Sequence, residues 1–173
     1  MQSGFDVKPP AEPIRKGLEV EREYTDTKGK PIGKVKLGSE IEVHLKLRAT
    51  ERGHLGNVAL VDLLPGGFEV VLSPPHSAQS ESSGESEEES KEQSPKWSAP
   101  FGTEKSTWRP DYADAREDRV VLYGEAGSSA REFVYRIRAV NAGTYSVAPA
   151  YGESMYDRSV QASSMGGKIE VEQ

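Results

Sequence analysis

The sequence contains no cysteine among its 173 residues. Disulfide bonds, thiolate metal sites and cysteine nucleophiles are therefore excluded. This absence does not fix the compartment, because exported bacterial proteins often have no disulfide bonds. Histidine is also scarce, and His44, His54 and His76 lack the spacing of metal ligands. We expect these three histidines to be surface residues.

Long apolar runs are missing as well. No stretch approaches the ~20 apolar residues that span a bilayer, and residues 1–13 lack the hydrophobic region of a signal peptide. We expect no direct membrane insertion by this chain. The proline-rich residues 1–17 predict a linker that leads into one domain of a larger protein, whose export signal or lipid anchor would lie elsewhere. The net charge of -6 argues against a nucleic-acid partner, which needs a basic face.

Catalytic motifs are absent from the sequence. There is no Gly-x-Ser-x-Gly or Ser-x-x-Lys pattern and no phosphate-binding loop. We therefore predict no enzyme, no catalytic residue and no cofactor. Four carboxylates crowd together and could line a calcium site: Asp111, Asp114, Glu117 and Asp118. Because Arg116 and Arg119 are interleaved with them, a solvated loop held by ion pairs is favoured over a metal site or a calcium-dependent enzyme.

The sequence does contain the alternating apolar and polar residues that are typical of β-strands. Residues 41–49 alternate apolar and polar side chains without a fault, and residues 18–25 place four side chains on one side and a charged row on the other. Residues 57–64 are continuously apolar, which is typical of a central strand covered on both faces. Shorter strands are predicted at 119–123 and 168–171, and residues 68–72 fit either a strand or a short helical turn.

About seven short strands and no long amphipathic helix predict an all-β fold, an antiparallel β-sandwich that could include one short helix. A single domain is expected over residues 18–173. Within it, residues 73–96 are almost all Ser, Glu, Gln, Pro and Gly, so we predict a flexible acidic insertion there. Trp97, Phe101 and Trp108 follow this insertion and are expected to mark where the chain packs against the domain again.

Residues 133–157 carry the densest pattern. Alternation over 133–139, a turn at 141–144 and renewed alternation from Tyr145 to Pro149 predict a β-hairpin. The aromatic tail after it contains Tyr151, Met155 and Tyr156. We predict that this tail plugs one end of the sandwich, so that Tyr156→Ala would cost roughly 3–5 kcal/mol. Contact with another domain is the alternative role for the tail.

Pro65, Gly66, Gly67 and Phe68 form a second local motif. The paired glycines would let the chain reverse after a buried strand so that Phe68 returns to the core. They could instead allow a partner's backbone to come close. The apolar strand before them favours the first interpretation.

Three segments together resemble the carboxy-terminal macroglobulin-like domain of bacterial alpha-2-macroglobulins: NVALVDLLPGGFE (57–69), WRPDYADAREDRVVLY (108–123) and FVYRIRAVNAGTYSVAPAYGESMY (133–156). The resemblance implies an immunoglobulin-like sandwich from a large, periplasmic, protease-trapping inhibitor. Its partners would be neighbouring domains of that inhibitor and, indirectly, target proteases. The motif residues that the resemblance marks as structural or interdomain are Asp62, Pro65, Gly66, Gly67, Phe68, Gly143, Tyr145, Pro149, Tyr151, Met155 and Tyr156. A surface adhesion or carbohydrate-binding module on the same architecture is the alternative, and it would show several exposed aromatic side chains on one face.

Overall fold

The computed structural model describes residues 12–72 and 101–173. Within these ranges every regular element is a β-strand, and the strands form three sheets. The six-stranded sheet has the order β1 (Arg15–Lys16), β12 (Gln161–Ser163), β11 (Tyr151–Ser154), β5 (His54–Leu63), β8 (Arg119–Gly127), β7 (Tyr112–Ala115). The four-stranded sheet has the order β2 (Leu18–Thr25), β4 (Glu40–Ala49), β9 (Arg131–Ala139), β6 (Phe68–Val70). The small sheet has the order β10 (Gly143–Val147), β13 (Gly167–Glu172), β3 (Lys34–Lys36).

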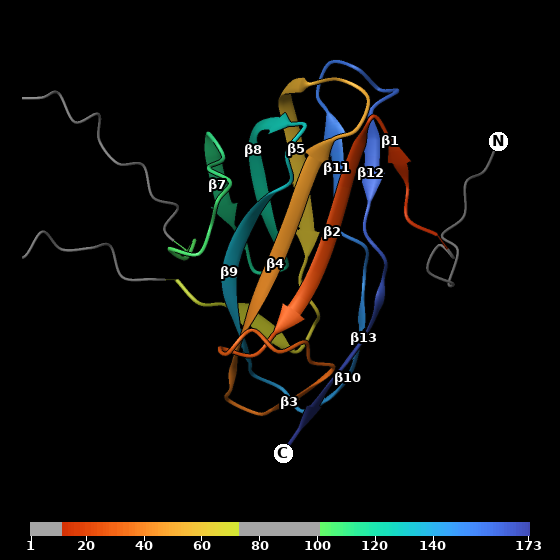
Figure 1. Ribbon diagram of the computed structural model, residues 1–173. Coiled ribbons are helices and arrows are strands. Elements are labelled where there is room, and N and C mark those ends of the chain that lie inside the picture. The colour runs from red at the N-terminus through yellow and green to blue at the C-terminus, as the bar shows by residue number, and fades with distance from the viewer. Residues whose placement is uncertain (1–11, 73–100) are drawn as a thin grey trace, which may run out of the picture.

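The two larger sheets face each other as a sandwich, with β2, β4 and β9 in front of β5, β8 and β11 (Figure 1). The small sheet lies at one end of the sandwich, below the others in that view. All strand pairs are antiparallel except β3 with β13. The all-β sandwich predicted from the sequence is confirmed.

The core lies between the two larger sheets and forms one cluster of buried side chains. Alternation places Leu45 of β4 and Phe133 of β9 on the inner face of one sheet, and Leu60 of β5 and Leu122 of β8 on the inner face of the other. Burial of each such side chain contributes about 1.5–3 kcal/mol. The sheets approach closely at Gly152 of β11, where a Cβ would lie 3.0 Å from Val20.

The segment after residue 100 joins β9 on the side of β6, along the part of β9 that β6 leaves unpaired. The amides of Thr103 and Trp108 donate to the carbonyls of Val134 and Glu132, and Ser106 Oγ exchanges hydrogen bonds with the Val134 backbone. Phe101 and Trp108 are buried, as predicted, and the Trp108 indole N–H donates to the Glu125 carbonyl at 2.8 Å. The predicted insertion and Trp97 lie outside the described residues.

The predicted β-hairpin is wrong. Residues 133–139 lie in β9, which pairs with β4 and β6, while β10 pairs with β13 in the small sheet. The chain crosses from one sheet to another at 140–143 because the Val140 amide donates to the Gly67 carbonyl, 2.8 Å away, and does not begin a tight turn back onto β9. Gly143 has a φ of 147°, which favours glycine at this corner.

Several predicted boundaries also change. Residues 68–70 form strand β6, so the possible short helix is not formed there. The strand predicted at 57–64 begins earlier, because β5 covers His54–Leu63. The carboxylate-rich stretch from Asp111 to Asp118, predicted as a solvated loop, contains strand β7 (Tyr112–Ala115). The predicted linker contains β1, whose pairing with β12 orders residues 15–16. Nearby, Ile14 and Ser163 exchange hydrogen bonds.

Candidate functional site

A buried polar cluster joins the two larger sheets inside the sandwich. It consists of Arg22 on β2, Asp62 on β5 and Tyr135 on β9. The Arg22 guanidinium contacts Asp62 Oδ1, and the Tyr135 hydroxyl donates to Asp62 Oδ2 at 2.8 Å. The side chains of Arg22 and Asp62 are only 2% and 1% exposed. Buried ions require partners of this kind, because an unpaired charge in the core is costly.

Arg22 also holds the crossover that follows the small sheet. Its Nη2 donates to the Ala148 carbonyl at 2.5 Å, and its guanidinium lies 5.3 Å from the centroid of the Tyr24 ring. Pro149, one of the predicted motif residues, is the next residue in this crossover and is half-buried. The cluster therefore links three parts of the fold: the front sheet, the back sheet and the connection between β10 and β11.

Burial and charge shift the protonation equilibria of the cluster. Burial disfavours the charge on Arg22, but the attraction and hydrogen bond of Asp62, together with the nearby Tyr24 and Tyr135, outweigh it, so the pKa of Arg22 is raised. Burial raises the pKa of Asp62, and contact with Arg22 and the Tyr135 hydroxyl opposes that rise. Burial and the negative charge of Asp62 together raise the pKa of Tyr135 well above its usual range. The cluster holds fixed charges in the core and presents no reactive group to solvent.

A tight corner accounts for five of the predicted motif residues, which are Pro65, Gly66, Gly67, Phe68 and Tyr145. A Cβ at Gly67 would overlap the Tyr145 ring at Cε2, so glycine lets the ring lie directly on the backbone. Phe68 returns to the core and meets Tyr145 edge-to-face at 6.5 Å. The Tyr145 hydroxyl donates to the carbonyls of Asn141 and Ala142. This corner supports the structural interpretation of the glycine pair, in which the close approach comes from the chain itself.

The aromatic tail does not plug the sandwich. Tyr156 is 81% exposed and Met155 is 53% exposed, whereas Tyr151 is half-buried on the outer face of β11 and its hydroxyl donates to Glu153. Met155 and Tyr156 follow the end of β11 in the bend that leads to β12. The prediction that these side chains fill the core is wrong. The apolar and aromatic composition of the tail suggested burial, but composition alone does not show whether a side chain points into the core or toward solvent.

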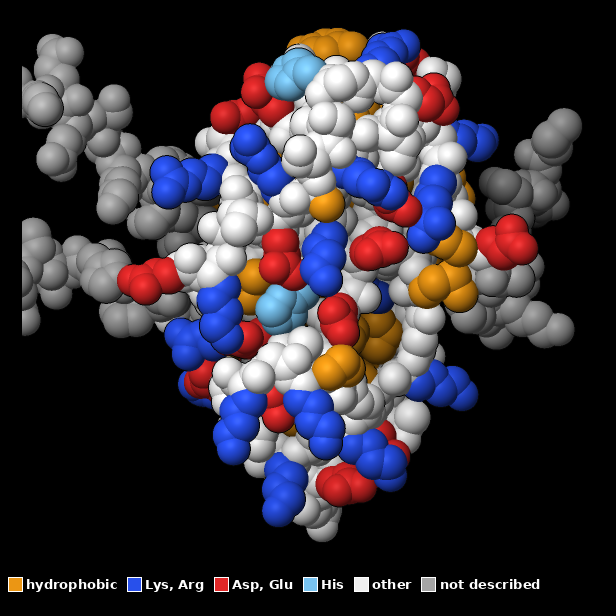
Figure 2. All heavy atoms as spheres, in the orientation of Figure 1, with side chains coloured by type: hydrophobic (Ala, Val, Ile, Leu, Met, Phe, Trp, Pro, Cys, Tyr) orange, Lys and Arg blue, Asp and Glu red, His pale blue; other side chains and the backbone are white. Residues whose placement is uncertain are grey.

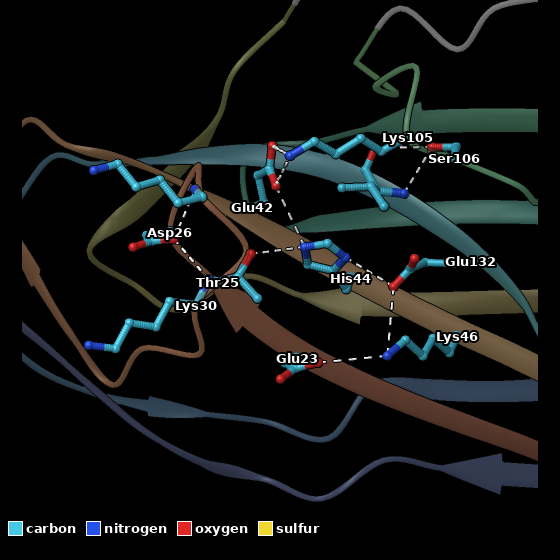
Figure 3. A network of polar contacts seen from close by, with 12 residues as sticks. Glu23, Thr25, Asp26, Lys30, Glu42, His44, Lys46, Lys105, Ser106 and Glu132 are labelled. Atoms are coloured by element: carbon cyan, nitrogen blue, oxygen red, sulfur yellow. Dashed lines mark hydrogen bonds and ion pairs between the residues drawn. The ribbon is translucent and has the colours of Figure 1, made fainter.

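An outer polar network covers the solvent side of the four-stranded sheet (Figures 2 and 3). Its seven members are Glu23, Thr25, Glu42, His44, Lys46, Lys105 and Glu132. His44 lies at its centre: Nδ1 is 3.0 Å from Glu132 Oε1 and Nε2 is 2.9 Å from Thr25 Oγ1. Lys105 Nζ donates to both carboxylate oxygens of Glu42 at 2.7 Å. Contrary to the prediction of a simple surface residue, His44 is mostly covered by these neighbours.

No group of three or more His, Asp or Glu side chains within 12–72 and 101–173 has the geometry to hold a metal ion. In the carboxylate-rich stretch, Arg116 pairs with Asp114 at 2.9 Å and Arg119 pairs with Asp118 at 2.6 Å. These contacts agree with the predicted ion-paired segment. In the same described ranges no helix is long and apolar enough to cross a membrane.

A groove of about 370 Å³ runs beside the edge strand β2. Its lining mixes both signs of charge with apolar side chains, among them Arg15, Glu21, His44 and Met165. Among the described residues, two aromatic residues are more than half exposed: Tyr112 on β7 and Tyr156 after β11. Strands β5 and β8 lie between β7 and β11 in the sheet, so these two rings are not neighbours.

The comparisons with known proteins identify the family. Residues 17–158 match the family model described as "Bacterial Alpha-2-macroglobulin MG10 domain". The chain belongs to this family. It is 47% identical over 165 residues to the alpha-2-macroglobulin homolog of Yersinia pestis and 34% identical over 171 residues to the alpha-2-macroglobulin of Pasteurella multocida. These alignments cover 95% and 98% of the chain but only 8% of each relative.

The MG10 fold is also present in solved structures. The Escherichia coli alpha-2-macroglobulin fragment from domain MG7 to the C-terminus superposes with a TM-score of 0.73 at 24% identity, covering 98% of this chain and 25% of that one. At this identity the likeness shows the fold alone. The family match and the curated relatives confirm the resemblance drawn from the three sequence segments. In the Escherichia coli structure the same fold forms one part of a longer chain.

Sequence reasoning marked Asp62 but missed its two partners. The signal for Arg22 was present, because it lies on the apolar side of the 18–25 alternation, where a lone cation requires a buried counter-ion. Nothing in the local pattern distinguishes the role of Tyr135 from that of Phe133, the other aromatic residue of β9, since that role depends on Asp62 of β5, which is 73 residues away along the chain.

Proposed function

We propose that this MG10 domain is a non-enzymatic structural module of a bacterial alpha-2-macroglobulin, an inhibitor that traps proteases. The observation that carries the proposal is the 47% identity to a relative named as an alpha-2-macroglobulin homolog, over 95% of the chain. The domain would pack on neighbouring domains and help to set the conformation of the whole inhibitor. The parent protein would act in the periplasm, anchored or free.

The polar clusters support a structural role. Arg22, Asp62 and Tyr135 bind one another inside the core, and the histidine of the outer network is enclosed by partners. Neither arrangement leaves a nucleophile beside a base in an open cavity, which nucleophilic catalysis requires. The exposed Met155 and Tyr156 suit contact with another domain, because large apolar side chains at the surface commonly mark interaction sites.

The test compares this chain with its parent protein. The isolated chain, mixed with trypsin at equal concentration, should leave the rate of casein cleavage unchanged, whereas the parent should reduce it. Cleavage of a small chromogenic peptide is the matched control, because enclosure in a trap would exclude casein by its size, whereas a small peptide would still reach the active site of the protease. Inhibition of casein cleavage by the isolated chain alone would contradict the proposal. A parent that leaves casein cleavage unaffected would contradict the trapping activity.

A further inference from the structure

The six-stranded sheet has an outer face that is unusually apolar for a surface. Its side chains point away from the core: Ala59, Val61 and Leu63 on β5, Val121 and Tyr123 on β8, and Tyr151 on β11. We call this set the outer apolar face. Strand register brings its members into contiguous rows, since Val61 lies between Tyr151 and Val121, and Ala59 lies beside Tyr123. At the sheet edge the Tyr112 ring lies 6.0 Å from the Tyr123 ring.

The outer face of the four-stranded sheet, on the opposite side of the molecule, is charged. The equivalent outward positions on the four-stranded sheet carry charged side chains, among them Glu21 and Glu23 on β2 and Lys46 and Arg48 on β4. Figure 2 shows charged side chains of both signs spread over the face turned toward the viewer. An antiparallel sheet with one solvated face normally alternates apolar and polar residues. The four-stranded sheet follows this rule, whereas β5 breaks it and is apolar on both faces. A strand of that kind is typical of a sheet that is covered on both sides.

We propose that the outer apolar face is the docking surface for another folded domain of the same, longer polypeptide. This inference rests on the proposed function, because it assumes a multidomain parent, and it names the surface through which the module acts. The chain corresponds to only 8% of the length of its relatives. A parent of similar length would have most of its residues outside this chain, and they could supply the second layer that the face lacks.

The charges around the face indicate the chemistry of that domain. Arg119 of β8 and Asp114 of β7 point outward, but they are paired with Asp118 and Arg116, respectively. Glu125 of β8 and Glu153 of β11 also point outward with the apolar side chains. Among the described residues neither has a lysine or arginine within 4.0 Å: Glu125 lies 3.8 Å from His54, and Glu153 accepts a hydrogen bond from the Tyr151 hydroxyl. The partner surface should have an apolar centre with Lys or Arg at its rim, which is the usual arrangement of complementary interfaces.

Two other occupants fit less well. In a second copy of this chain packed face to face, the acidic rims would repel each other. The chain's own residues 73–100 consist mostly of Ser and Glu with few apolar side chains, so they offer little to bury against Val61 and Val121. A neighbouring domain satisfies both the apolar centre and the acidic rim.

The absence of cysteine gives a direct test. Leu63→Cys places a single thiol on the outer apolar face, where the native side chain is 37% exposed. Lys46→Cys is the matched control on the charged sheet, where the native side chain is 44% exposed. Each variant is prepared in the isolated chain and in the parent protein, and the rate of maleimide labelling is followed by mass spectrometry of the peptide that contains the new thiol.

We expect the thiol of the Leu63→Cys variant to be labelled at least about tenfold more slowly in the parent than in the isolated chain. The labelling rate falls in proportion to the fraction of time for which the thiol is accessible, and a docked domain should leave it accessible for no more than about a tenth of the time. The control should change by less than about twofold. Equal rates for the Leu63→Cys variant in both proteins would overturn the proposal. Labelling of the isolated chain that slows as its concentration rises would overturn it in favour of self-association. Faster labelling after removal of residues 76–95 from the isolated chain would overturn it in favour of the insertion.

Two further measurements keep the result interpretable. Tyr112→Cys, at the edge of the same face, replaces the Leu63→Cys variant if the latter does not show a normal unfolding transition. Protease inhibition by the unlabelled parent is measured on the same preparation. Inhibition without protection would refute the docking surface alone, whereas protection without inhibition would refute the trapping function alone.

Discussion

The buried polar cluster and the outer polar network are built from similar groups and lie in very different surroundings. Each combines a cation, a carboxylate and a hydroxyl, and β2 contributes to both. Arg22 points into the core, and its neighbour Glu23 points to solvent. Successive side chains of a strand face opposite sides, so one position along the chain separates the two environments.

The difference between them lies in what happens when a partner is lost. In the core, an ion left without its counter-ion has no water to replace it, so the loss costs several kcal/mol. On the sheet surface, water and salt ions replace the partner, so the loss lowers the free energy of unfolding by only about 0–1 kcal/mol. The buried cluster should therefore decide whether the domain folds, and the outer network should adjust the stability of a domain already folded.

The sharpest test of this contrast is Asp62→Ala. The variant leaves Arg22 buried without a counter-ion and removes the acceptor of the Tyr135 hydroxyl. We expect the free energy of unfolding to fall by about 3–5 kcal/mol. Urea unfolding followed by tryptophan fluorescence measures this change, since Trp108 is buried in the folded domain.

The control for Asp62→Ala removes both charges together. In the double variant Arg22→Met with Asp62→Leu, no ion remains unpaired, so much of the lost stability should return. A loss below about 1 kcal/mol in the single variant would show that water reaches the cluster and that burial does not control its energy.

Alkaline pH provides a second test. Burial raises the pKa of Tyr24, and the negative charge of Asp62 adds to the effect; Tyr135 is shifted in the same direction for the same reasons. In the unfolded chain these phenols lose their protons near a pH of about 10, whereas in the folded domain they hold them. Above that pH the folded state binds more protons than the unfolded state. The contribution of these two phenols to the free energy of unfolding is therefore fully present below about pH 10 and is lost as the pH rises further.

The variant that isolates this effect is Tyr24→Phe. It keeps the ring beside Arg22 and removes one titrating hydroxyl for which the structure shows no hydrogen bond among the described residues. We expect the thermal midpoint of the variant to fall less steeply with pH above about 10 than that of the original chain. Equal slopes would mean that Tyr24 titrates normally in the folded domain.

The sequence patterns that succeeded are those that depend on one strand at a time. The alternation over 18–25 and 41–49 predicts which side chains of β2 and β4 face the core, because burial of an apolar row fixes the side of a strand locally. The placement of Phe68 in the core and the docking of Phe101 and Trp108 follow from the same preference for burial.

The failures concern which strands become neighbours. The turn residues at 141–144 suit a hairpin, yet the Gly67 carbonyl, more than 70 residues earlier, captures the Val140 amide and sends the chain to a different sheet. Tyr135 was missed as a partner of Asp62 for the same reason. Pairing depends on contacts distant in sequence, and a single strand's pattern does not contain them.

On the outer network, Lys46→Met is expected to have a small effect. Lys46 Nζ lies 3.7 Å from Glu23 and 3.9 Å from Glu132, and the lysine side chain is 44% exposed. The free energy of unfolding should fall by about 0.2–1 kcal/mol at low salt. At about 1 M salt, where the screening length is near 3 Å, the difference from the original chain should nearly vanish. A loss that persists at high salt would place this lysine in a structural role like that of Arg22.

The smallest effect is expected for Tyr156→Ala, and it completes the contrast between buried and exposed phenols. A buried aromatic such as Tyr135 would cost about 3–5 kcal/mol on truncation to alanine. Tyr156 is 81% exposed, so its truncation should change the free energy of unfolding of this chain by no more than about 0.5 kcal/mol. Urea unfolding of the isolated chain tests this. A loss above about 2 kcal/mol would restore the plug predicted from the sequence. If the isolated chain is unaffected while the same substitution lowers the unfolding midpoint of the parent protein, the ring must be buried there against another domain.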